Sequence, residues 1–424
     1  MELENLKSKL SKPICDALEI TEKYIPYLEK YILEYANLRE ENWIENFEKH
    51  CENSNLSIEA IIMVKNQEKQ IISCIDSISE IVDQILILDT GSTDNTVTNI
   101  KKMKLDKLKL YQETWQEDFS YMRNKTLSLA TGDWLLIIDS DETLNSDIDK
   151  DDLKKIINIV SFFCKDFLLQ IEARFPKSPR FILPDRIIKN IPDFYFYGEV
   201  HEEIRSVSGN INRIQSSISV YNNGTLPSEM KKFDKFNRYT KLLKKMIKNE
   251  PNNPRWVTLS DKDTALSVFK DETYIDILLK FIKKDTTKNL TYDNVESNIY
   301  VKTLLQKYIN ELLFLNKNNE ALRVVKFSRV IYPNNIDFLF YEYMLKKMFV
   351  DTQMKNIFDD FLFESIQLNE KSLFESQKDE QLLQALMSKM LSSLGEHKKS
   401  ELLIDKISDP LVIDYLKMKD QVIR

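Results

Sequence analysis

The sequence predicts three parts: an N-terminal helical segment, a mostly parallel α/β domain and an all-helical C-terminal region. Three observations predict this. The 424 residues include only six glycines, where ordinary usage is roughly 7%, and this scarcity favours long helices with few special turns. Short apolar runs alternate with amphipathic helices from Leu56 to about Gly224. Beyond Leu226 helical periodicity runs to the end of the chain.

The N-terminal segment, residues 1–55, contains no glycine and is rich in Leu, Glu and Lys. Proline is not accommodated inside a regular helix, so Pro13 and Pro26 are expected to divide this segment into two or three helices. Residues 56–225 are expected to form the α/β domain, and residues 226–424 the C-terminal helical domain.

The α/β domain is defined by the alternation of its elements. Apolar runs predict strands at 57–64, 84–88, 107–111 and 133–138, and amphipathic segments predict helices at 71–78, 94–103 and 119–130. Strands that alternate with helices of this length form a mostly parallel sheet with right-handed crossovers.

The C-terminal region carries a weak repeat. The segment at 331–335 has the outline of 249–253, and Gly395 opens a third segment of similar pattern. An interval of about 80 residues fits two tetratricopeptide-like repeats of roughly 34–40 residues each. Unrelated helices that stop at Pro-Asn pairs are the alternative.

Composition limits the class of protein. The net charge of −7 and the pI near 5.4 disfavour a general nucleic-acid binder, which is expected to be basic. The four cysteines show no CxxC or CxxH spacing, so free thiols in the cytoplasm are expected. The N-terminus lacks a signal-peptide core, and no run approaches 18 apolar residues, so no membrane span is expected.

The first acidic motif follows the expected strand at 84–88. Asp89 precedes a turn that contains Gly91 and Asp94. Parallel α/β sheets bind ligands at the carboxyl ends of their strands, where a carboxylate suits ribose hydroxyls or a base N–H. A turn of this kind is also a common helix cap.

The second acidic motif closes the strand at 133–138. Asp139 and Asp141 flank Ser140 where the chain leaves the strand. Two hard oxygen ligands there can hold Mg²⁺ or Mn²⁺ and leave positions open for a diphosphate. The pattern also arises by chance in acidic chains, but an unpaired charge at the end of a buried strand is costly.

Two further segments carry candidate residues. Arg123 lies at a helix start, where a cation and the helix N-terminus could bind a diphosphate; a solvated helix face is the alternative. His201 follows Gly198 and precedes Glu202 and Glu203. It could be a metal ligand, a proton-transfer group or a structural hydrogen bonder.

Five motifs occur in one order: VKNQE (64–68), LDTGSTDNT (88–96), MRN (122–124), GDWLLIIDSDE (132–142) and YGEVHEE (197–203). This ordered set resembles the family 2 glycosyltransferases of the GT-A fold, which is Rossmann-like. It is most similar to the sublancin-type peptide S-glycosyltransferases of glycocin biosynthesis. Relatives often carry a His before the Asn-Gly that follows a late strand, whereas this chain has Tyr221-Asn222-Asn223-Gly224.

The resemblance implies a UDP-sugar donor and a divalent metal, Mg²⁺ or Mn²⁺. It implies metal ligation by Asp141 and Asp139, with His201 as a further ligand. It implies Glu202 as the acceptor-side base, with Glu203 or His201 as second choice. It places the nucleotide sugar on eight residues: Lys65, Asn66, Asp89, Gly91, Asp94, Arg123, Asp139 and Ser140.

The resemblance also implies an acceptor, a Cys, Ser or Thr side chain of a bacteriocin precursor peptide, with glucose as the sugar. The helical region is expected to bind the peptide or to form a homodimer, because helical repeats offer extended concave surfaces. Two other functions remain open: a family 2 glycosyltransferase acting on a cell-surface saccharide or lipid-linked acceptor, and a non-catalytic helical-repeat adaptor.

Overall fold

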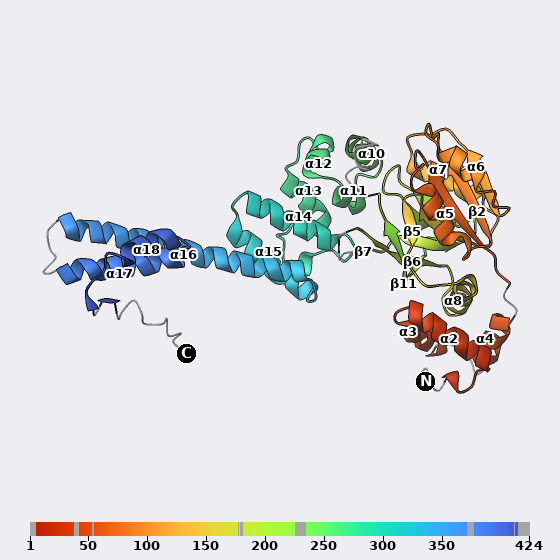
Figure 1. The fold of residues 1–424 in the computed structure, drawn as a ribbon, viewed down its shortest axis with the longest axis horizontal. Coiled ribbons are helices and arrows are strands. Elements are labelled where there is room, and N and C mark those ends of the chain that lie inside the picture. The colour runs from red at the N-terminus through yellow and green to blue at the C-terminus, as the bar shows by residue number, and fades with distance from the viewer. Residues whose placement is uncertain are drawn as a thin grey trace. The chain divides into compact units, whose positions relative to one another are not determined.

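The computed structural model (Figure 1) describes residues 6–37, 42–52, 55–176, 178, 181–224, 235–370, 377–410 and 412–413. The chain divides into two compact units, Met1–Pro251 and Asn252–Arg424. The division lies at 251/252, later than the boundary expected at 225/226, because helix α10 (Lys235–Asn249) belongs to the first unit. The division into three domains stays a prediction.

The first unit is built on a nine-stranded sheet in the order β3-β2-β1-β4-β8-β6-β11-β5, with β7 paired to β6. The four expected strands all form and are parallel to one another, as predicted: β1 (Ile58–Val64), β2 (Gln84–Asp89), β3 (Leu108–Gln112) and β4 (Trp134–Asp139). Three helices connect them: α5 (Ile71–Ser79), α6 (Thr96–Lys102) and α7 (Phe119–Leu129).

The rest of the sheet lies in a part for which no strands were predicted, and its pairing is antiparallel except that β11 is parallel to β6. Strand β8 pairs antiparallel with both β4 and β6, and β5 pairs antiparallel with β11. These strands are β5 (Glu142–Leu144), β6 (Phe167–Arg174), β7 (Phe181–Ile182), β8 (Asp185–Lys189) and β11 (Asn212–Asn222). A separate hairpin joins β9 (Phe194–Tyr197) and β10 (Glu203–Ser206).

Side-chain alternation along the strands gives the sheet two buried faces. In β1, Ile58, Ala60 and Ile62 belong to the larger core, which includes α5, α8 (Lys150–Phe163) and the N-terminal helices. Ile61 points to the opposite face and packs with α7 and the β9–β10 hairpin. Because β1 is covered on both faces, its sequence is continuously apolar except for Glu59.

The N-terminal segment forms three described helices, α2 (Lys12–Tyr24), α3 (Leu28–Asn37) and α4 (Trp43–Glu52). Pro26 separates α2 from α3 as expected, whereas Pro13 lies in the first turn of α2, where proline is tolerated. Trp43 and Phe47 pack against Phe163 of α8, so these helices cover one face of the α/β unit (Figure 1).

The second unit is helical, as predicted. Its helices are α11 (Pro254–Leu259), α12 (Lys262–Val268), α13 (Tyr274–Ile282), α14 (Val301–Phe314), α15 (Asn318–Ile331), α16 (Ile336–Glu370), α17 (Gln377–Ser393) and α18 (His397–Ile404). The pairs α14–α15 and α17–α18 have the outline of tetratricopeptide repeats, with Gly395 at positive φ between the second pair. Helix α16, with 35 residues, is as long as a whole such repeat.

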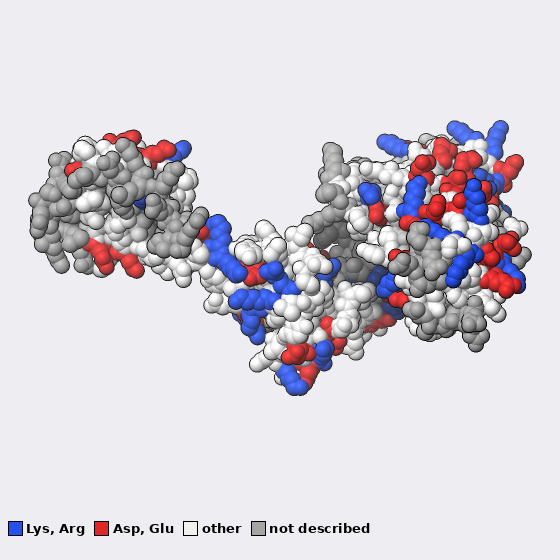
Figure 2. Space-filling view, turned by 90° about the horizontal axis from the view of Figure 1, so that it is seen from below, with Lys and Arg blue, Asp and Glu red and all other residues white. Residues whose placement is uncertain are grey.

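Three general properties of the described residues are the distribution of surface charge, the state of the cysteines and the apolar character of the helices. On the face drawn in Figure 2, basic and acidic side chains are interspersed. All four cysteines are free thiols. Within the described parts of the chain, no helix has the length and apolar character needed to cross a bilayer.

Candidate active site

The candidate site lies where the parallel strands end. Strand β1 lies between β2 and β4, and the register places Val64 beside Asp89 and Met63 beside Asp139. The chain therefore leaves β1 toward one side and later returns on the other, which is the topological switch point where α/β sheets bind ligands. The two acidic motifs meet at this edge, as their positions after strands predicted.

A cavity of about 460 Å³ opens at this edge of the sheet. It brings together seven of the residues singled out from the sequence: Lys65, Arg123, Asp139, Ser140, Asp141, His201 and Glu202. Five others lie outside its lining, namely Asn66, Asp89, Gly91, Asp94 and Glu203. Sequence motifs thus located the cavity, and the structure separates the residues that face it from those that support it.

Asp139 is held by two buried arginines. Arg123 of α7 donates to one carboxylate oxygen, and Arg186 of β8 donates to the other at 2.8 Å. Burial alone would raise the pKa of Asp139, but Arg186 and Arg123 hold it well below its usual range. The Asp139 carboxylate is therefore ionised and firmly oriented.

Arg123 links the two sides of the cavity. Besides Asp139, it donates from Nε to Glu202 Oε1 at 3.1 Å, and the residue is only 7% exposed. Its guanidinium is thus engaged by two carboxylates, one after β4 and one just before β10. The expected contact of Arg123 with a diphosphate stays a prediction.

Glu142 braces the acidic motif from behind. It is fully buried and accepts hydrogen bonds from the backbone N–H of Asp139 at 3.0 Å, from Arg186 at 2.7 Å and from Asn222 at 2.9 Å. Burial raises its pKa, and Arg186 opposes that shift. Neither Glu142 nor Arg186 was predicted as a site residue: Glu142 directly follows the Asp-Ser-Asp motif, whereas Arg186 lies in a strand with no motif.

Asp141 depends on a glycine from the end of the sheet. A Cβ on Gly224 would collide with the Asp141 carboxylate, and the N–H of Asn223 donates to the Asp141 carbonyl at 3.0 Å. The segment after β11 therefore packs directly on Asp141, and only glycine leaves room for its side chain.

The residues fit an open cation site that uses few protein ligands. Asp141 and His201 both line the cavity, while Asp139 is paired with arginines. Among the described residues, no group of three or more His, Cys, Asp or Glu side chains is arranged as a complete metal cage. Mg²⁺ is commonly held by one or two carboxylates, with substrate phosphates and water as the other ligands.

The predicted nucleotide loops form a rigid platform beside the cavity. Asn66, at φ 52°, accepts from the N–H of Thr93 at 2.7 Å, and its own N–H donates to Ser92 Oγ at 2.9 Å. Asp94 accepts from the N–H of Thr96 at 3.0 Å. Asp89 is buried and accepts from the N–H of Ser92 at 3.2 Å. In this structure both acidic side chains cap the turn.

The segment at 197–203 places its acidic residues differently. His201 adopts φ 51° and lies edge-on to Tyr239 of α10, with ring centroids 5.4 Å apart. Glu202 faces the cavity beside Arg123. Glu203 instead begins β10 and pairs with Arg205 at 3.0 Å, so of the three predicted base candidates it is the one that lies outside the cavity.

An aromatic shelf of Trp115, Phe119 and Tyr239 forms one wall of the cavity and supports Arg238. The guanidinium carbon of Arg238 lies 5.5, 5.1 and 5.6 Å from the three ring centroids, in that order. Arg238 and Tyr239 come from α10, which the sequence had assigned to the helical domain, and no motif marked them.

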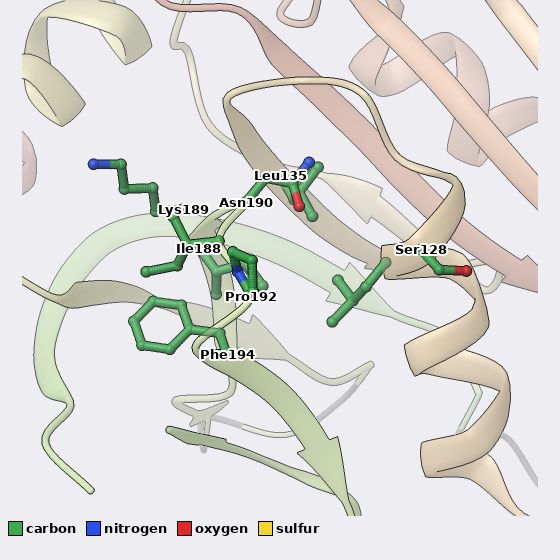
Figure 3. Close-up of a pocket in the computed structure, with 9 residues that line it drawn as sticks. Ser128, Leu135, Ile188, Lys189, Asn190, Pro192 and Phe194 are labelled. Atoms are coloured by element: carbon green, nitrogen blue, oxygen red, sulfur yellow. The ribbon is translucent and has the colours of Figure 1, made fainter. Parts of the chain in front are cut away.

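A second cavity, of about 330 Å³, lies away from this chemistry. It surrounds Leu135, near the start of β4, and so lies at the opposite end of that strand from Asp139. Figure 3 shows Ile188, Pro192 and Phe194 gathered together, while the Lys189 ammonium points away from them. This apolar wall continues the core beneath α7.

Residues 59–222 match the family model described as glycosyl transferase family 2. This stretch of the chain thus has the sequence pattern of family 2 glycosyltransferases. The matched residues span β1 to the end of β11 and include both acidic motifs. The predicted family and the predicted GT-A-type fold class are confirmed.

Two proteins with sequence similarity to this chain are described as glycosyltransferases. The chain is 30% identical over 259 residues to the SPbeta prophage-derived glycosyltransferase SunS of Bacillus subtilis, which covers 60% of this chain and 61% of the relative. An uncharacterized glycosyltransferase of Rickettsia felis is 30% identical over 132 residues, 30% of this chain and 44% of the relative. The chain thus spans about three fifths of the length of SunS and less than half of the Rickettsia protein.

Among solved structures, S. aureus TarS 1-349 in complex with UDP-GlcNAc aligns with 69% of this chain and 91% of that chain. The sequence identity is 16% and the TM-score 0.35.

Proposed function

We propose that the chain is a metal-dependent, inverting glycosyltransferase that moves a sugar from a UDP-sugar to a peptide side chain. The observation that carries this proposal is the single cavity shared by Asp139, Asp141, His201 and Glu202 at the carboxyl edge of a family 2 domain. The acceptor we propose is a Cys, or a Ser or Thr, of a bacteriocin precursor peptide, and the sugar is glucose. The likeness to SunS supports this choice.

The donor binds with its nucleotide along the ends of β1 and β2. Lys65 lines the cavity there, and the platform around Asn66 and Asp94 fixes its position. Asp89 holds the uridine, because a carboxylate that accepts from the N–H of Ser92 can accept further hydrogen bonds from a ligand. Gly91 then lets the turn approach the nucleotide without a side chain.

The diphosphate lies beside the Asp-Ser-Asp motif. Asp141 would hold the Mg²⁺ or Mn²⁺, with Asp139 acting directly or through water and His201 as a further ligand. A bound divalent cation neutralises charge on the departing diphosphate. Arg186 and Arg123 hold the pKa of Asp139 well below its usual range, so this carboxylate is ionised.

The acceptor enters on the side of His201 and Glu202. A free thiol has a pKa near 8.5, so a nearby base assists its ionisation. Glu202 takes the proton, the sulfur forms a bond to the anomeric carbon, and the bond from that carbon to the diphosphate oxygen breaks with its electron pair. Arg123 orients Glu202 for this step through the bond to Nε. Glu203 and His201 are the alternative bases.

Incubation with UDP-glucose, Mg²⁺ and a Cys-containing precursor peptide tests this proposal. Mass spectrometry should show one added hexose, and replacing the acceptor Cys with Ser separates thiol from hydroxyl preference. Asp141→Ala is the matched negative control. If the protein is a non-catalytic adaptor, we expect the wild-type chain to show no sugar transfer, no donor hydrolysis and no donor binding.

The same assay separates the other acceptors. Transfer to a lipid-linked or cell-surface saccharide, with the peptide left unmodified, would replace the peptide proposal and keep the enzyme class. We further propose that the helical region contributes to a homodimer. Light scattering of the full chain and of a chain ending at Pro251 tests that role, since only the full chain should then be dimeric.

A further inference from the structure

Arg238 differs from the other arginines of the site because no acidic side chain is bonded to it among the described residues. Arg123 is bonded to Asp139 and Glu202, and Arg186 to Asp139 and Glu142. Arg238 instead lies against the aromatic shelf, and its buried Nε has no hydrogen-bond partner in the described part of the chain. A buried donor without an acceptor is costly unless a ligand supplies one.

The position of Arg238 is favourable for an anion. It lines the same cavity as Asp139, Asp141 and Lys65. A cation on aromatic faces is attracted to the rings and keeps its planar fork oriented. A guanidinium in that state can form two parallel hydrogen bonds to a phosphate.

We propose that Arg238 binds the diphosphate of the donor nucleotide and stabilises it as it departs. This rests on the proposed function and assigns the anion site to helix α10. The carboxylates of Asp139, Asp141 and Glu202 would repel a diphosphate placed beside them. Since Arg123 is already balanced by two of them, Arg238 supplies the additional positive charge.

Calorimetric titration of the full chain in Mg²⁺ tests the proposal, with UDP as the direct ligand and uridine as a competitor at millimolar concentration. Arg238→Gln should weaken UDP binding by about tenfold or more, because a hydrogen bond to a charged group is lost. Uridine should compete equally well with wild type and variant. Arg238→Lys keeps the positive charge but lacks the planar guanidinium, so we expect a loss of UDP affinity smaller than that of Arg238→Gln.

Lys241→Gln is the matched control, because Lys241 lies on the exposed side of the same helix and outside the cavity lining. It should leave UDP binding unchanged. Each variant is also checked for an unchanged melting temperature. An equal loss of UDP and uridine affinity would mean that Arg238 only supports the wall, and would overturn the proposal.

Unchanged UDP binding in Arg238→Gln would also overturn it. If that variant bound UDP normally but lost affinity for the acceptor peptide, the anion recognised would be a carboxylate of the acceptor. A wild-type chain that binds neither UDP nor uridine rejects the UDP donor of the proposed function itself. Binding to the wild-type chain is measured before any variant. A wrong donor is thereby distinguished from a wrong role for Arg238.

Discussion

The two ends of the central sheet both bury carboxylates, but they satisfy them differently. At the amino end, Glu59 of β1 is fully buried, and one of its oxygens accepts from the backbone N–H groups of Thr131 and Gly132. At the carboxyl end, Asp139 and Glu142 are bonded to arginine side chains, and Asp139 lines an open cavity. The bonds to Glu59 attach the turn at Thr131 and Gly132 to strand β1. The arginine pairs of Asp139 instead hold a charged group beside the cavity.

This contrast shows that burial alone does not identify a functional acid. Backbone N–H groups fix Glu59 in one place, and Gly132 packs so closely that a Cβ would lie 2.7 Å from the Glu59 Cβ. The arginine side chains paired with Asp139 can instead change their hydrogen bonds when a ligand binds in the cavity. We therefore expect substitutions at the carboxyl end to reduce turnover, and substitutions at the amino end to reduce stability.

The largest effect is expected from Asp141→Asn. Asparagine keeps the shape but removes the charge that we propose for the cation, so turnover should fall by at least about 100-fold. The melting temperature should stay close to that of wild type, because asparagine keeps the size and shape of the aspartate side chain. Hexose transfer by mass spectrometry and thermal unfolding are measured on the same preparation. Full turnover would show that Asp141 has no part in the reaction.

Gly224→Ala should have the next largest effect on turnover. The new Cβ would press on the Asp141 carboxylate, and the carboxylate can move only by leaving its place in the cavity. Turnover should fall by about tenfold, with a higher Mg²⁺ concentration needed for half-maximal rate. Thermal unfolding of the variant on the same preparation serves as the control, because it separates a displaced Asp141 carboxylate from a general loss of stability. Unchanged Mg²⁺ dependence would contradict a cation site at Asp141.

The sequence predicted one half of the site better than the other. Asp139 and Asp141 lie in a motif at the end of β4, and the apolar run of that strand is strong enough to locate its end. His201 was singled out from its sequence neighbours Gly198, Glu202 and Glu203. Arg186 lies in a short antiparallel strand, and Arg238 in a helix with many other cations. Their role depends on long-range pairing, which local sequence does not encode. The contacts of the two arginines with the site therefore became visible only in the folded chain.

Glu59→Gln should act on stability. The amide lacks the negative charge that the N–H groups of Thr131 and Gly132 stabilise. We expect a loss of about 1–3 kcal/mol in the free energy of unfolding, measured by urea denaturation. Turnover per folded molecule should be unchanged. A drop in turnover without a drop in stability would mean that the two ends of the sheet do not differ as described.

The smallest expected effect is the pH dependence contributed by Glu142. Its pKa is raised by burial above the ordinary 4.5, so its contribution to stability is complete at low pH and decreases as the pH rises through the folded-state value. Denaturation of wild type and Glu142→Gln at pH 5 and pH 8 measures this contribution. The stability of wild type relative to the variant should fall by about 1–2 kcal/mol between the two pH values.

Asp139 does not interfere with this comparison, because its pKa is lowered from 3.8 and its contribution is lost only on acidification below that range. Cys74 and Arg186 also face Glu142 and are present in both proteins. A difference that is equal at pH 5 and pH 8 would mean that Glu142 stays ionised throughout. Arg186 would then outweigh burial at both carboxylates it contacts, and the carboxyl end would hold two permanent ion pairs.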